Sequence, residues 1–274
     1  MLRLSAFKPH LKQTSHPREA KIHSHHHITA YYSATVTLVL ARISPDCMSE
    51  EEDRLPFAKP ATSPTPAADT ATDTTDNIIM APPNSKPTPQ TYRILVACLS
   101  LFVLLGGYYA ATRPAGVGFR LPFSLHPLLM VLGYVGLMGT AHVTKKLGGY
   151  SNTKLHGYLA SAGLATSFCG LYAIWRNKDN MGKEHLTSYH SWGGIASLVG
   201  LVLPALAGLI FLHPDFGIDK TNGDYRLAHK WAGRLFTVGG WISCVVGLNQ
   251  MVDSRAELVM FAAPLVLLAP FVLI

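Results

Sequence analysis

The apolar residues of this chain are concentrated after about residue 90, where long apolar runs alternate with short polar segments. A transmembrane helix needs about 20 consecutive apolar residues, and six runs come close to that length. The first is expected at 94–111, the second at 121–143 and the sixth at 258–274, while the third ends near 175, the fourth near 212 and the fifth near 250. The pattern therefore predicts an all-α membrane protein of six transmembrane helices, with a central four-helix bundle in residues 91–274.

Residues 1–90 are not expected to fold. Glycine is absent there, and the stretch SPTPAADTATDTTD at 63–76 is of low complexity. Three interpretations remain open: a polar cytosolic extension, a basic mitochondrial presequence, or a start codon assigned too early, since Met48 opens a plausible alternative start. We favour the disordered extension or the early start over targeting.

Composition and charge exclude other classes. Of 274 residues, 49% are hydrophobic and only 14% are charged, which indicates a multi-pass membrane protein. The formal charge of +7 does not indicate nucleic-acid binding, because the basic residues lie at span ends and in the tail. Three of the four cysteines, at 98, 169 and 244, lie inside apolar spans, so neither a disulfide framework nor a zinc site is expected.

Four of the six spans open with a histidine. The openings read FSLHPLLM, TKLHGYLA, TSYHSWGG and RLAHKWAG, and they contain His126, His156, His190 and His229. An ionisable residue within a span is costly and usually functional. Because consecutive spans run antiparallel, His126 and His190 should share one membrane face, and His156 and His229 the other. Two imidazole pairs suit two stacked haems whose axial positions are both filled, as in electron transfer.

At these motifs the chain resembles the cytochrome b561 family, in its short single-domain form. SLHP, LHGY and HSWGG carry the resemblance, which covers about residue 92 to the C-terminus. It implies two b-type haems, one between the second and fourth spans and one between the third and fifth. It also implies electron transfer from cytosolic ascorbate, or a related enediol, to monodehydroascorbate or ferric iron. A homodimer in an endomembrane, vacuolar or lysosomal membrane would fit the family.

The resemblance also points to residues that contact the substrates. The family uses a lysine two residues before the third-span histidine for ascorbate, which is Lys154 here. A second lysine of the family is replaced by Tyr150, so Lys146, Arg226 and Lys230 are candidate substitutes. These cations could instead only set topology or neutralise propionates.

Two further residues are candidates near the haems. Arg234 could pair with a haem propionate or extend to the membrane surface. His185, five residues before His190, is a candidate for the acceptor side.

Orientation and helix ends complete the expectations. Basic residues number eight on the N-terminal side of the membrane and six on the other, which favours cytosolic termini and places His156 and His229 at the cytosolic face. We expect Ser151 and Asp224 to cap the third and fifth spans.

His142 is expected to be an ordinary solvated histidine at the interface. The three glycines at 133, 136 and 139 could admit either another helix or a flat macrocycle.

Two other functions compete with electron transfer. The histidines could form the relay of a proton or ion transporter, although a relay would stagger them through the membrane depth. The chain could also bind haem only structurally. Reduced b-type absorption bands in a detergent extract would distinguish a relay from the haem proteins.

Overall fold

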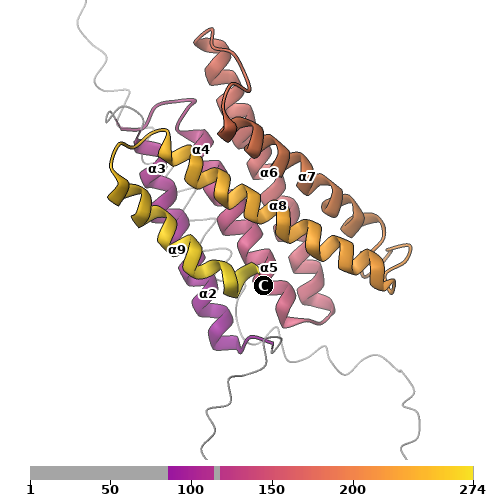
Figure 1. Cartoon of the computed structure of the whole chain (residues 1–274). Coiled ribbons are helices and arrows are strands. Elements are labelled where there is room, and N and C mark those ends of the chain that lie inside the picture. The colour runs from indigo at the N-terminus through magenta and orange to yellow at the C-terminus, as the bar shows by residue number, and fades with distance from the viewer. Residues whose placement is uncertain (1–85, 114–117, 274) are drawn as a thin grey trace, which may run out of the picture. The chain divides into compact units, whose positions relative to one another are not determined.

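The computed structural model describes residues 86–113 and 118–273, and Figure 1 shows their arrangement. The expectations for residues 1–85 lie outside the described residues. Within them, every regular element is helical, and six helical spans are long and apolar enough to cross a membrane. The prediction of an all-α six-span protein is confirmed.

Two of the spans contain a short π-helical segment. The first span consists of α2 (Pro89–Phe102), η2 (Val103–Gly107) and α3 (Tyr108–Thr112), and the second of α4 (Leu125–Met130), η4 (Val131–Leu137) and α5 (Met138–Leu147). The other four are continuous: α6 (Tyr150–Asn180), α7 (Tyr189–Ile210), α8 (Gly223–Asn249) and α9 (Arg255–Leu273). Helix α6 extends five residues beyond its predicted end at 175.

Helix starts follow local hydrogen bonding, and two of the predicted caps are wrong. Helix α6 begins directly after Gly148 and Gly149, whose φ angles of 75° and 82° allow an abrupt reversal from α5, so Ser151 lies inside the helix. Helix α8 is capped by Asn222, whose side chain accepts from the backbone N–H groups of Asp224 and Tyr225 at 2.9 and 3.1 Å. Asp224 therefore occupies the first turn, where its charge suits the helix dipole.

The spans associate as two antiparallel helix pairs. The second span packs along α6, and α7 packs along α8. Contacts of α6 with α7, and of α8 with α4 and η4, close these pairs into a four-helix ring, while α2 and α9 pack on the second span from outside. Across the diagonals of the ring, between α6 and α8 or between α7 and the second span, the helices contact each other far less.

Glycines of the second span let two other spans approach it closely. A Cβ atom at Gly133 would lie 2.2 Å from Ser167 Oγ and 2.8 Å from the Gly163 carbonyl oxygen of α6. One at Gly136 would meet Val103 of the first span at 2.8 Å, and one at Gly139 would meet Leu99 at 3.1 Å. Of the two explanations for these glycines, close helix packing is the one the structure supports.

The outer faces of the ring helices are apolar. On α7 the exposed large apolar side chains recur every three or four residues, which defines one stripe: Val199, Leu203, Leu206 and Ile210. Such a stripe would be unfavourable in water and is suited to lipid tails.

We expect Gly133→Ala to destabilise the protein by about 1–3 kcal/mol, because the added methyl group overpacks a contact with the backbone of α6. Thermal unfolding in detergent measures this loss. Gly193→Ala is the matched control, since nothing lies within 4 Å of its added Cβ, and alanine is favoured over glycine in helices by up to about 1 kcal/mol. Equal stability of the two variants would contradict the close approach.

Candidate functional site

The four span-opening histidines lie in two pairs. The imidazole centroids of His126 on α4 and His190 on α7 are 6.0 Å apart, and those of His156 on α6 and His229 on α8 are 6.1 Å apart. Each pair joins helices on a diagonal of the ring, where direct helix contacts are few.

All four imidazoles have the same kind of hydrogen-bond partner, which is a backbone carbonyl of a neighbouring helix. The Nδ1 atoms lie 2.9–3.0 Å from these oxygens: His126 with Gly170, His156 with Ala141, His190 with Ser243 and His229 with Pro204. A carbonyl oxygen can only accept, so each Nδ1 must carry the proton and donate it. The lone pair of each ring is then on Nε2, which is the usual state of a metal-bound histidine with an oriented second nitrogen.

The spacing of each pair fits one metal atom between the rings. Bonds from a metal to two imidazole nitrogens of about 2 Å each account for about 4 Å of the centroid separation. The remaining distance of about 2 Å corresponds to the separation between the bonding nitrogen and the ring centroid, counted once for each of the two rings. Among residues 86–113 and 118–273 no cluster of three or more histidine, cysteine or acidic side chains could hold a metal ion, so each pair supplies two protein ligands only.

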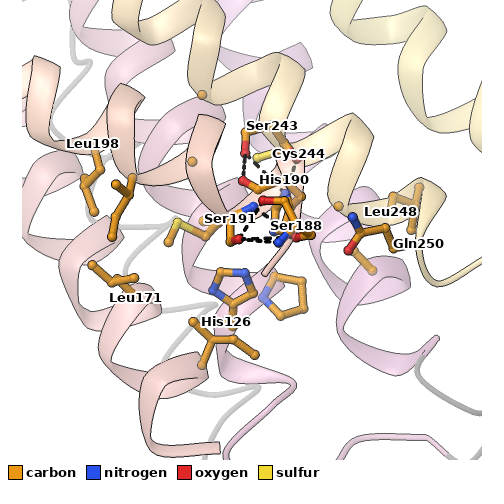
Figure 2. A pocket seen from close by; sticks show the side chains of 18 of the residues that line it. His126, Leu171, Ser188, His190, Ser191, Leu198, Ser243, Cys244, Leu248 and Gln250 are labelled. Carbon is orange, nitrogen blue, oxygen red and sulfur yellow. Dashed lines mark hydrogen bonds between the residues drawn. The ribbon is translucent and has the colours of Figure 1, made fainter. Parts of the chain in front are cut away.

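A cavity of about 550 Å³ lies at the His126–His190 pair (Figure 2). This volume is in the range of cofactor sites, and the lining is mainly apolar, with residues from α4, η4, α6, α7 and α8. Three glycines, Gly194, Gly240 and Gly247, line the cavity. A Cβ at Gly247 would lie 2.7 Å from the His190 ring, so glycine is needed for the imidazole to occupy its place.

One polar atom of the cavity wall has no hydrogen-bond partner among the residues that the structure describes. The Tyr134 hydroxyl is buried and forms no hydrogen bond, although the Tyr134 carbonyl accepts from Trp241 Nε1 at 2.8 Å. A buried hydroxyl without a partner costs about 1–3 kcal/mol. The orphaned hydroxyl, the apolar walls and the paired imidazoles together fit a large, mostly apolar group with a central metal.

The two pairs are at opposite ends of the ring. His126 is at the start of the second span, whereas His156 bonds to Ala141, fifteen residues further along it. At 1.5 Å per residue this separation is about 22 Å along the helix axis. The pairing by parity thus places the histidines where the structure has them.

The prediction that His142 is an ordinary solvated histidine at the interface is wrong. It lies within the bundle, where its Nε2 is 3.1 Å from Oγ1 of the fully buried Thr237. Its ring centroid is 6.4 Å from that of His156, close to the spacing of the two pairs. Its hydrogen bonding differs from the other four, however, since Nε2 is the nitrogen engaged. The sequence gives no periodic motif for it, unlike the span-opening histidines.

The cations proposed to attract ascorbate are near the His156–His229 pair, and several already have partners. Lys154 Nζ is 3.0 Å from Asp215 Oδ2, and the Tyr150 hydroxyl donates to Asp215 Oδ1. These two hydrogen bonds, Tyr150 first, hold the pKa of the exposed Asp215 carboxyl below its usual range. Lys146 donates to the Phe271 carbonyl at 2.6 Å.

The remaining candidates lie on α8 or at the opposite rim. Arg226 Nε donates to the Lys220 carbonyl at 3.0 Å, Lys230 is exposed, and the Arg234 guanidinium lies 5.4 Å from the centre of the Trp231 ring. At the other rim, His185 lines the cavity, stacks on Trp175 at 3.8 Å and contacts Asp179 Oδ1 through Nε2 at 2.9 Å.

Fold and site together define a class: a helical membrane protein whose central four-helix ring carries two pairs of facing histidines, one pair at each end. Residues 125–253, which cover the entire ring, match the family model of eukaryotic cytochrome b561. The family resemblance indicated by the histidine motifs is therefore confirmed, and the match extends over residues 125–253. The family implies haem b as the cofactor.

Similar proteins carry related descriptions. The chain is 30% identical over 162 residues to the transmembrane ascorbate-dependent reductase CYB561 of Sus scrofa, covering 56% of this chain and 62% of that protein. It is 37% identical over 109 residues to the ascorbate-specific transmembrane electron transporter 1 of Zea mays, covering 38% and 46%. It is 30% identical over 135 residues to the lysosomal membrane ascorbate-dependent ferrireductase CYB561A3 of Danio rerio, covering 47% and 54%. The chain thus matches about half to three fifths of the length of these relatives.

We expect Gly247→Ala to lower the haem b content per protein, because the added methyl group displaces the His190 imidazole. Helix propensity alone would favour alanine here by up to about 1 kcal/mol, so a loss of haem is attributable to the site. The pyridine haemochrome assay on purified protein measures the ratio. Gly208→Ala, whose Cβ would lie 3.0 Å from the His229 ring, should act in the same direction but less strongly. A full haem complement in both variants would count against the placement of these imidazoles.

Proposed function

We propose that this protein is a transmembrane di-haem b cytochrome that passes single electrons from ascorbate, or a similar enediol, across the membrane to monodehydroascorbate or ferric iron. One haem is held by His126 and His190 and the other by His156 and His229. The observation that carries the proposal is the shared state of these four imidazoles. Each donates from Nδ1 to a helix carbonyl, and each faces a partner about 6 Å away.

The one-electron chemistry would be supplied by the haem, and the protein's part is to hold and enclose it. His126 and His190 would hold one haem through two ring nitrogens, and His156 and His229 the other, and haem held in this way would supply one-electron transfer. The helix carbonyls fix the orientation of the imidazole rings, so the four side chains would be held ready to bind the haem. Apolar walls such as those of the 550 Å³ cavity keep water from the haem.

Two haems are proposed because one would leave too long a gap. The hydrocarbon core is about 30 Å thick, and the two imidazole pairs are separated by about 22 Å along the second span. Each pair is therefore near one membrane surface, within reach of a soluble donor or acceptor.

The donor side is proposed to be the His156–His229 end, in the cytosol. Ascorbate is an anion at neutral pH, and Lys154, Lys146, Arg226 and Lys230 supply positive charge there. Arg234 is proposed to be the propionate partner. His185, beside the mouth of the His126–His190 cavity, is proposed to contact the acceptor. Cytosolic termini, a homodimer and an endomembrane, vacuolar or lysosomal location complete the proposal.

A histidine relay for protons fits the hydrogen bonds less well. A relay needs imidazoles that exchange protons along a path. Here all four Nδ1 protons are committed to helix carbonyls, and the four rings gather at two depths instead of forming a series.

Ligand substitutions test the two-haem assignment. His126→Ala and His190→Ala should remove one and the same haem, and His156→Ala and His229→Ala the other, because each change removes one of the two histidines that would hold that haem. Haem content and the electron paramagnetic resonance signals of the low-spin haems identify which one is lost. His142→Ala is the matched control and should keep both haems, since its Nε2 is engaged with Thr237. If His142→Ala removes the haem and His156→Ala does not, the cytosolic pair has been misassigned.

Electron transfer itself is tested in sealed vesicles. Protein oriented with its His156–His229 end outward, and vesicles loaded with ferric chelate, should produce internal ferrous iron when ascorbate is added outside. The chelate colour reaction measures the rate, and vesicles with the His126→Ala variant are the control. Haem-replete protein that ascorbate reduces but that delivers no electron inside would indicate a structural haem protein instead.

A further inference from the structure

The cation proposed to bind the donor already carries an anion. Asp215, in the loop between α7 and α8, bonds through one carboxylate oxygen to Lys154 Nζ at 3.0 Å and through the other to the Tyr150 hydroxyl. Lys154 Nζ also lies 5.2 Å from the centre of the Tyr150 ring. These three side chains form a cluster in which the charges of Lys154 and Asp215 cancel.

The loop holds Asp215 in place before any donor arrives. The Asp215 backbone N–H donates to His213 Nδ1 at 3.2 Å, and the His213 ring stacks on Phe216 at 3.8 Å. The loop also folds back onto the end of α7, because the N–H of Ile218 donates to the Ile210 carbonyl at 3.0 Å. The carboxylate is therefore presented to Lys154 by an ordered backbone.

We propose that Asp215 is a specificity-determining residue of the donor site, whose carboxylate occupies Lys154 and Tyr150 until an anionic enediol displaces it. This inference rests on the proposed function. A carboxylate offers two oxygens that share a negative charge, and the anion of an enediol offers a charged oxygen next to a hydroxyl group. The ammonium of Lys154 and the hydroxyl of Tyr150, each bonded to a different Asp215 oxygen, can serve either anion.

Because the Asp215 carboxylate competes with the donor for Lys154 and Tyr150, it affects which anions can bind at this site. A donor must bring enough affinity to release Asp215, so weakly bound anions are disfavoured and a higher concentration of ascorbate is needed. Because Asp215 is hydrogen-bonded by Tyr150 and Lys154, it remains ionised at neutral pH and the competition persists. The side chains of Lys154 and Asp215 are about a third exposed, at 31% and 38%, so the effect is a modest one.

The test is Asp215→Asn in the full chain with both haems bound. Stopped-flow reduction of the haem bands at increasing ascorbate gives the half-saturating concentration and the maximal rate. Exposed ion pairs of this kind correspond to a change of about 1.5- to fivefold. We expect the half-saturating ascorbate concentration to fall by this factor, with unchanged haem spectra and maximal rate. Rising salt should then weaken ascorbate binding more steeply than in the wild type, since the Lys154 charge is no longer neutralised.

Asp219→Asn is the matched control. Asp219 is in the same loop and carries the same charge, but its Oδ2 accepts from Asn222 Nδ2 at 2.9 Å. If only the loss of one negative charge mattered, both variants would lower the half-saturating ascorbate concentration equally. The proposal requires this decrease in Asp215→Asn alone. An uncharged quinol donor should reduce wild type and Asp215→Asn equally.

The outcomes separate this inference from the proposed function. Wild-type haem that ascorbate does not reduce overturns both. Three results would overturn only the role of Asp215, provided that ascorbate reduces the wild type. The half-saturating ascorbate concentration of Asp215→Asn could equal that of the wild type, equal that of Asp219→Asn, or be higher than that of the wild type.

Discussion

The architecture depends on one interaction repeated four times, an imidazole N–H donated to a carbonyl inside a neighbouring helix. In the membrane a polar group has no water to bond, so each histidine proton must find a partner in the protein. The four bonds are reciprocal within each helix pair. His126 of the second span bonds to α6 and His156 of α6 bonds back to the second span, while His190 and His229 link α7 and α8 in the same way. Both helix pairs are thus fastened at their two ends, and the remaining nitrogens of the histidines are directed away from their own pair.

This arrangement separates two tasks that a ligating histidine must perform. One nitrogen is fixed by the helix pair that contains it, and the other is available to a group shared with the opposite pair. Glycine contributes at the points of closest approach, since Gly247 leaves room for the His190 ring and Gly208 for the His229 ring. Polar side chains gather at both ends of the ring: Lys154, Tyr150 and Asp215 meet at one end, and His185 stacks on Trp175 at the other.

The sequence was sufficient for features that depend on periodicity and parity. Long apolar runs define the six spans, and antiparallel succession assigns the partner of each span-opening histidine. Contacts between residues that are far apart in the sequence could not be predicted from it. Asp215 is 61 positions from Lys154, and no local signal connects them. His142 looks like a residue at a span end until Thr237 of α8 is placed beside it. The caps at Ser151 and Asp224 were wrong because two glycines start α6 earlier and Asn222 captures the first N–H groups of α8.

The reciprocal bonding within the helix pairs bears on how the protein assembles. Each pair is a hairpin of consecutive spans that can satisfy its own histidine protons as soon as both of its helices are inserted. Contacts between the hairpins are fewer than those within them, and the facing imidazoles belong to different hairpins. A group bound between facing imidazoles would therefore join the two hairpins. Its binding free energy would add to the free energy of their association. The stability of the assembled bundle would therefore rise with the concentration of the group that binds there.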